Sequence, residues 1–186
     1  LSDDLRMSSG VGTMSREFVV GTIDEFDWVQ VAGAIDHPEK GKVVDMNETI
    51  REETGVEDAS LKIYPVSGYG TPELLRHLLK IEKPDAILHY TDPRFWVWLY
   101  QMEHEIRQHI PIFYYNIWDD YPYPRWNEPY YESSDLIMNI SKQTVNIVNG
   151  VCRDKPRTDW DSTYVPHGIS TKYYYPITEE KERLEM

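Results

Sequence analysis

Apolar and polar positions along the chain predict strands separated by helices. Residues 26–33 and 61–66 are apolar runs with the length and composition of strands. The connection between them, residues 36–60, is polar and rich in charge, and its weak apolar periodicity predicts a long loop or a peripheral excursion. Four further apolar runs predict strands at 86–90, 110–117, 136–140 and 163–165.

Most of the segments between these runs are predicted to be helices. Thr71 followed by Pro72 is typical of a helix start, as are Asp92 with Pro93 and, later, Ser141. The apolar positions that recur at helical spacing are Met14, Phe18 and Val19; Leu74, Leu75, Leu78 and Leu79; Phe95, Leu99, Met102 and Ile106; and Val145 and Val148. The alternation predicts an α/β fold: a Rossmann-like, doubly wound, mainly parallel sheet whose ligands bind outside the carboxyl ends of the strands.

Length and composition narrow the class of protein. The 186 residues suffice for one hydrophobic core, and no stretch approaches the ~20 apolar residues that a membrane helix needs. We therefore expect a water-soluble domain without a transmembrane segment. The first residues of the sequence have neither the basic start nor the apolar run of a secretory signal, and Cys152 is the only cysteine, so we expect no internal disulfide and a cytoplasmic protein.

The charge balance argues against polyanionic partners. The formal net charge is −13, and the 19 Lys and Arg residues form no basic cluster, so we expect no nucleic-acid partner. A small anion is still compatible with this charge, because the amino end of a helix binds phosphate in proteins of either sign. The 14 Tyr and 6 Trp are unusual, and many fall between Tyr90 and Trp126, where they would form a core, an interface or a surface for sugar rings.

A glycine-rich stretch precedes the first predicted helix. Gly10, Val11, Gly12 and Thr13 could bring backbone N–H groups close to a phosphate. The third glycine of a dinucleotide-binding motif is replaced by Ser15, and most of the strand that should come first is missing. A plain tight turn before a helix is an equally good interpretation.

Two polar segments fall where predicted strands end. Trp118, Asp119, Asp120 and Tyr121 follow the most hydrophobic strand, where carboxylates would accept hydrogen bonds from sugar hydroxyls and rings would stack on a sugar. The same residues are also good turn formers. His89 and Asp92 lie at the end of the preceding strand and are candidates for the same cleft, although Asp92 would equally cap a helix and His89 would equally be a buried histidine.

Two other motifs point elsewhere. His104 and His109 are five residues apart, whereas a zinc-protease helix needs four, and we predict no metal site. Residues 159–161 have the Asp-X-Asp form of some metal-dependent glycosyltransferases, but they lie in a polar segment that predicts a solvated loop.

The segment at 164–176, together with residues 83–87 and the early glycines, resembles the retaining GT-B glycosyltransferases of the family-four type. Their first domain ends on a pattern of Pro-X-Gly-hydrophobic-Asp followed by an aromatic residue and Pro; here His167 fills the variable position before Gly168, and Ser170 replaces the Asp. The resemblance implies that residues 1–176 form an amino-terminal Rossmann-like domain, with 177–186 leading to a carboxyl-terminal domain that the sequence lacks.

The resemblance also implies an activity: transfer of a sugar from a nucleotide-sugar donor to a hydroxyl acceptor, without a metal or other cofactor. Residues 10–13 would lie near the donor diphosphate, and His167 and Gly168 between the domains. By itself this fragment would have little activity, because the second domain's paired glutamates hold the donor. The alternatives are a non-catalytic carbohydrate- or nucleotide-binding module and a Rossmann oxidoreductase, for which Asp27 and Asp36 bracket the position of a ribose-binding acid.

Overall fold

The strands form two four-stranded, mainly parallel sheets in a computed structural model that describes residues 1–155, 161–171 and 174–176. The first sheet has the order β1-β2-β4-β3, with β1 at Ser2–Asp3, β2 at Trp28–Gly33, β4 at Leu61–Pro65 and the antiparallel edge strand β3 at Val44–Asp45. The second has the order β5-β6-β7-β8, at Ile87–His89, Ile112–Asn116, Leu136–Asn139 and Ser162–Tyr164. All pairs except β3–β4 are parallel.

The two sheets meet where β1 runs beside the end of β5. Ser2 and Tyr90 form a parallel bridge, and the N–H of Tyr90 donates to the carbonyl of Leu1 over 2.9 Å. Read across this bridge, the parallel strands follow the order 4-2-1-5-6-7-8, in which the winding direction reverses between β1 and β5. This is the doubly wound order, so the predicted Rossmann-like α/β architecture is confirmed.

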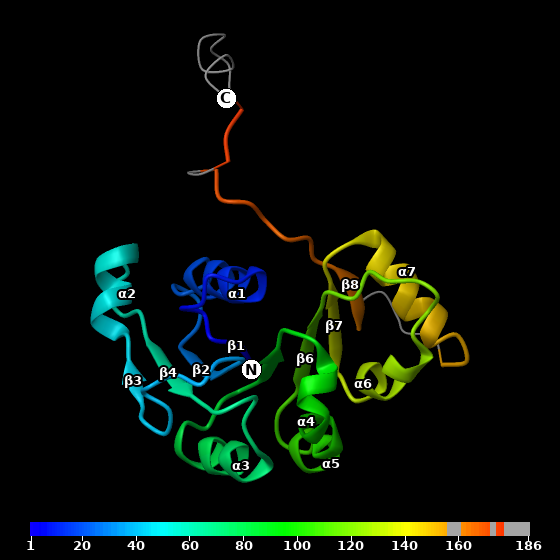
Figure 1. The fold of residues 1–186 in the computed structure, drawn as a ribbon, viewed down its shortest axis with the longest axis horizontal. Coiled ribbons are helices and arrows are strands. Elements are labelled where there is room, and N and C mark those ends of the chain that lie inside the picture. Colours follow the sequence, from blue (N-terminus) through cyan, green and yellow to red (C-terminus); the bar gives the residue numbers. More distant parts are fainter. Residues whose placement is uncertain (156–160, 172–173, 177–186) are drawn as a thin grey trace.

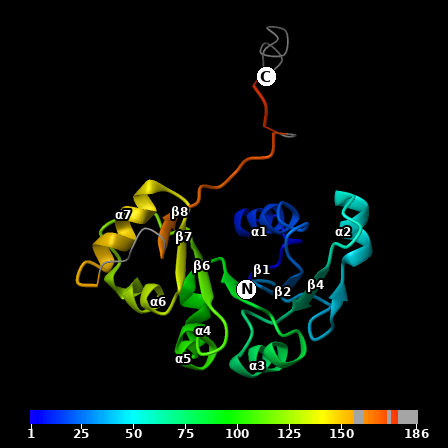
Figure 2. The same ribbon diagram turned by 180° about the vertical axis from the view of Figure 1, so that it is seen from behind.

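Helices lie on both sides of the strands (Figures 1 and 2). On one side are α1 at Gly10–Val20 and α2 at Asn47–Thr54. On the other are α3 at Pro72–Ile81, the 3-10 turn η1 at Pro93–Trp96, α4 at Val97–Gln101 and α5 at Glu103–Ile106. The connection η2 at Arg125–Asn127 leads to α6 at Glu128–Glu132, and α7 at Lys142–Val151 precedes β8.

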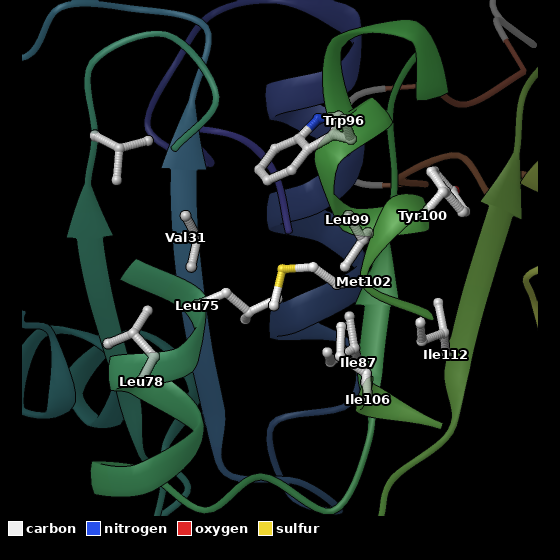
Figure 3. Close-up of a cluster of buried hydrophobic side chains, with 11 residues drawn as sticks. Val31, Leu75, Leu78, Ile87, Trp96, Leu99, Tyr100, Met102, Ile106 and Ile112 are labelled. Carbon is white, nitrogen blue, oxygen red and sulfur yellow. The ribbon is translucent and has the colours of Figure 1, made fainter. Parts of the chain in front are cut away.

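Neighbouring residues of β2 show how the sheet separates two cores. Val31 packs with Leu75 of α3, Trp96 and Leu99, in the cluster drawn in Figure 3. Ala32, one residue later, packs on the opposite face with residues of α1 and α2. This two-residue alternation is the strand period, and it buries both faces of the central strands. A third cluster joins Tyr114 of β6 to α6, β7 and α7.

Several helix predictions were correct in place but incomplete in detail. Thr71 caps α3 by accepting the N–H of Leu74, and Leu75 and Leu78 are its buried positions. The polar connection at 36–60 contains β3 and α2, which were not predicted; α2 buries only Ile50 and ends at Gly55, in the left-handed region at φ 74°. One apolar residue in so short a helix leaves little periodicity to detect.

The helix predicted from Asp92 is broken into η1, α4 and α5. Leu99, Met102 and Ile106 are buried as predicted, but the prediction for Phe95 was wrong: its side chain is 54% exposed and Trp96 is buried instead. The 3-10 turn rotates the chain by a different angle per residue from an α-helix, which shifts the first inward position by one residue.

Candidate functional site

The carboxyl ends of the parallel strands form one edge of the molecule, and two polar segments meet there. Asp92 follows β5, and residues 117–120 follow β6, its hydrogen-bonded neighbour. They surround a hollow of about 210 Å³ lined by Asp92, Pro93, Tyr114, Ile117, Trp118, Asp119 and Asp120. The structure thus brings four sequence-predicted residues, Asp92, Trp118, Asp119 and Asp120, into one pocket.

Asp92 is both a helix cap and part of the pocket. Its carboxylate accepts the backbone N–H of Arg94 over 2.9 Å and pairs with the Arg94 guanidinium, whose Nε lies 3.0 Å from each carboxylate oxygen. Burial opposes ionisation of this carboxyl, but the hydrogen bonds and charge of Arg94 outweigh it and lower the pKa of Asp92. Asp92 is therefore an anion whose charge is already partnered.

Trp118 forms the apolar wall of the pocket. The guanidinium carbon of Arg94 lies 5.2 Å from the centre of the Trp118 ring, a cation–π contact that couples the two sides of the pocket. The indole N–H of Trp118 is buried and has no acceptor among the described residues. A flat ring beside carboxylates is suited to a ligand with apolar faces and hydroxyl edges.

Asp119 and Asp120 stand exposed at the mouth of the pocket. The backbone carbonyl of Asp119 accepts a 2.7 Å hydrogen bond from the Gln143 side chain of α7, and a carboxylate oxygen of Asp120 accepts the N–H of Tyr121 over 2.9 Å. In the part of the chain that the structure describes, neither side chain has an ion pair with a cation. Tyr121 is half exposed and does not line the pocket; its ring packs on that of Tyr123.

His89 lies in the core and not at the pocket surface. Its side chain is fully buried, stacked on Tyr114 at 5.1 Å between ring centres, with Nδ1 2.7 Å from the hydroxyl of Tyr100. The suggestion that His89 faces the cleft is therefore corrected, because the rings of Trp96, Tyr100 and Tyr114 pack against its side chain and leave it no exposed surface. Burial holds the pKa of His89 well below its ordinary value.

This burial predicts a pH dependence of folding. Below the ordinary histidine pKa of 6.5, His89 is protonated in the unfolded chain but stays neutral in the folded one. The free energy of unfolding should therefore decrease as the pH is lowered below 6.5, and this contribution should be lost only in that range. The expected slope from this group approaches about 1.4 kcal/mol per pH unit. In urea unfolding between pH 7 and pH 5, the free energy of unfolding of His89→Phe should decrease less than that of the wild type. The control His104→Gln, at an exposed position, should show the wild-type decrease. Equal decreases for His89→Phe and the wild type would contradict the assignment.

Gly10, Val11, Gly12 and Thr13 form the first turn of α1, so the glycines lie inside the helix and not in a loop before it. Ser9 caps this turn: its Oγ accepts the N–H of Gly12 over 3.0 Å and its carbonyl that of Thr13 over 2.8 Å. Among the described residues, the N–H groups of Gly10 and Val11 have no acceptor. Because α1 follows the parallel strand β1, this helix start lies at the carboxyl edge of the strands, the edge that also carries the pocket.

His167 packs at the junction between the two sheets, and Gly168 beside it is exposed. The His167 ring lies 5.9 Å from that of Tyr90 and 5.3 Å from that of Tyr115, and its Nε2 is 3.4 Å from the Tyr90 hydroxyl. Tyr115 also contacts Phe18 of α1, so His167 lies on the α1 side of the sheet. Tyr114, which lines the pocket, points to the opposite side.

Two residues at this edge escaped the sequence analysis. Tyr114 lines the pocket, but within a continuous apolar run nothing distinguishes it from a core residue. Asp3 ends β1 at the junction and is 9% exposed; its Oδ1 has no partner among the described residues, and burial raises its pKa against a lowering hydrogen bond with Thr91. Only the strand order places Asp3 beside the end of β5, and no strand was predicted at the amino terminus that could have drawn attention to it.

The remaining predictions concern the Asp-X-Asp motif, the carboxyl-terminal residues, metal binding and membrane segments. Residues 159–160, most of the Asp-X-Asp motif, and 177–186 lie outside the described residues. Within the described ranges, no group of three potential metal-binding side chains comes together, and no helix is long and apolar enough to cross a membrane. Comparisons with models of known protein families, with curated proteins and with solved structures found no match. The fold and pocket define a Rossmann-like α/β protein with a candidate ligand site at its carboxyl edge.

Proposed function

We propose that this chain is the acceptor-binding half of a GT-B glycosyltransferase of the retaining, family-four type. The observation that carries the proposal is the pocket at the ends of β5 and β6, in which Asp119 and Asp120 stand beside the Trp118 ring. Carboxylates accept hydrogen bonds from sugar hydroxyls, and the apolar face of a sugar ring packs on indole. The resemblance at 164–176 adds the expectation of a second domain that holds the nucleotide-sugar.

In the proposed enzyme, the two sides of the edge have different tasks. The N–H groups of Gly10 and Val11 would face the donor diphosphate, whose developing negative charge the amino end of α1 would stabilise. The acceptor would lie against Trp118, with its hydroxyls bonded to Asp119 and Asp120. His167 and Gly168, on the α1 side of the sheet, would lie near the crossing to the second domain. No general base is assigned.

The two candidate ribose-binding acids of the oxidoreductase alternative lie at different ends of β2. Asp27 precedes β2 and therefore lies toward the amino ends of the strands, away from the pocket. Asp36 follows β2 by three residues and pairs with Lys40 at 2.7 Å. A non-catalytic carbohydrate-binding module remains the second candidate, because the pocket residues alone would serve binding as well as transfer.

The test uses the polypeptide as its gene encodes it, beside residues 1–186. Calorimetry with UDP, GDP and NAD, followed by assays with UDP- and GDP-sugars, should give nucleotide-sugar hydrolysis or transfer by the longer protein. Tight NAD binding without such turnover would overturn the proposal. Saccharide binding by both forms without turnover of any donor would favour the binding module.

The acid pair gives a sharper prediction. Asp119→Asn combined with Asp120→Asn should lower kcat/KM for the acceptor roughly tenfold, because hydrogen bonds to charged groups contribute about 1.5–3 kcal/mol and these are partly exposed. Hydrolysis of the donor without acceptor should be unchanged. The matched control removes two exposed carboxylates before β2, Asp24→Asn with Asp27→Asn, and should leave both rates intact; a similar loss in the control would contradict the assignment.

A further inference from the structure

The segment at 117–127, hereafter the aromatic loop, displays more ring surface than the pocket uses. Trp126, Tyr121 and Tyr123 are 60%, 50% and 43% exposed, and none of them lines the pocket. Burying these rings would be favourable, so a folded chain that keeps them in water at its ligand edge points to a binding surface.

The aromatic loop is held in place by the body of the protein. The N–H of Trp118 donates to the side-chain carbonyl of Asn116 over 3.1 Å, and Gln143 donates to the carbonyl of Asp119. The Tyr123 ring lies directly on Gly150 of α7, where a Cβ would come within 2.7 Å of ring carbons. A ligand that stacks on these rings therefore does not have to order the backbone first.

Two indole rings lie in succession along this surface. Trp118 is the wall of the pocket, and the centre of the Trp126 ring is 6.4 Å away at an interplanar angle of 79°. A ligand that fills the pocket against Trp118 and continues outward meets a second ring immediately. A pocket of about 210 Å³ has room for a group the size of one sugar ring, so the second ring would contact the next unit.

The charges beside the two rings select the kind of ligand. Asp119 and Asp120 are exposed anions that line the pocket, and Arg94 is already paired with Asp92, whereas the exposed Arg125 precedes Trp126 in the aromatic loop. In the pocket, an anionic ligand would meet the Asp119 and Asp120 carboxylates, on a chain of net charge −13. A neutral ligand with many hydroxyls would instead supply the hydrogen-bond donors that these carboxylates accept.

We propose that the acceptor is a neutral oligosaccharide of at least two sugar residues, whose terminal residue occupies the pocket against Trp118 while the next residue stacks on Trp126. This inference rests on the proposed function and specifies its substrate class. The Trp126 ring lies outside the reacting centre. It therefore affects how kcat/KM depends on acceptor length and does not affect the reaction of the donor.

The experiment measures acceptor kcat/KM on the gene-encoded protein, with neutral gluco-, manno- and galacto-configured saccharides of one to four residues and sialylated counterparts. In the wild type, kcat/KM should rise roughly 3- to 10-fold from the mono- to the disaccharide, the range expected for one aromatic contact. Trp126→Ala should abolish this rise, and the control Phe26→Ala, at a ring 58% exposed before β2, should retain it. Sialylated acceptors should be poorer.

Each other result overturns the inference in a recognisable way. The role of Trp126 is rejected if kcat/KM is equal for acceptors of all lengths, or if Trp126→Ala and Phe26→Ala behave alike. In either case, the proposed function still stands as long as the protein turns over a donor. A preference for sialylated acceptors rejects the charge argument. A wild type that self-associates and becomes monomeric in Trp126→Ala assigns the surface to a second copy of the chain. If the protein neither turns over any donor nor binds any saccharide, the proposed function is rejected together with the inference.

Discussion

Gly12→Ala is expected to destabilise the fold by roughly 2 kcal/mol or more, whereas Gly10→Ala, two residues earlier in the same helix turn, is not. A Cβ on Gly12 would lie 2.6 Å from the carbonyl oxygen of Met7 and 2.9 Å from that of Asp4. Both are backbone atoms, so α1 or the preceding turn would have to move, and overpacking of this kind typically costs about 1–3 kcal/mol. Nothing lies within 4 Å of a Cβ on Gly10.

The two glycine variants form a matched pair, because each adds one methyl group to the first turn of α1. Guanidinium unfolding should place the midpoint of Gly12→Ala well below the wild type and that of Gly10→Ala at or above it, since alanine in a helix is favoured over glycine by about 0.5–1 kcal/mol. Equal midpoints for the two variants would mean that α1 does not pack closely on the turn after β1.

Trp96→Ala is expected to cost about 3–5 kcal/mol of folding free energy, the range for emptying a buried aromatic position. Trp96 has no exposed surface and belongs to the buried cluster of Figure 3. Its ring also packs against those of His89, Tyr69 and Trp98. The resulting cavity would lie beneath the loop that carries Asp92, so partial collapse should also disturb the pocket. Thermal unfolding and urea titration at pH 7 measure the loss.

The neighbouring ring provides the control. Phe95→Ala removes a side chain that is 54% exposed and stacked on Tyr69 at 4.8 Å, a contact for which we expect about 0.5–1.5 kcal/mol. If Phe95→Ala were the more damaging of the two, the inward-facing position of η1 would be residue 95, as the helical spacing alone predicted.

Most of the strands could be predicted because their signal is local. Residues 61–65 and 136–139 are short apolar runs between polar segments, and burial on both faces leaves a continuous apolar pattern. Helices in which several apolar residues recur were also predicted, as at α3. Among the failures, α2 and Phe95 occur where one buried residue or a 3-10 turn removes the regular period.

The candidate pocket was predictable only in part. Asp92, Trp118, Asp119 and Asp120 follow apolar runs, and the parallel arrangement then requires them to share an edge. His89 also ends such a run, but it is buried by the rings of Trp96, Tyr100 and Tyr114, which come from other segments of the chain. Tyr114 lines the pocket, but no motif in the sequence marks it.

The amino-acid sequence by itself determined the alternation of elements, the parallel α/β class and the polar segments that follow the strands, because these depend on periodicity and on turn-forming residues within short windows. The tertiary structure alone decided which ends become neighbours. It set the junction of β1 with β5, the burial of His89, the close packing at Gly12 and the exposure of Trp126, since each depends on contacts between residues distant along the chain.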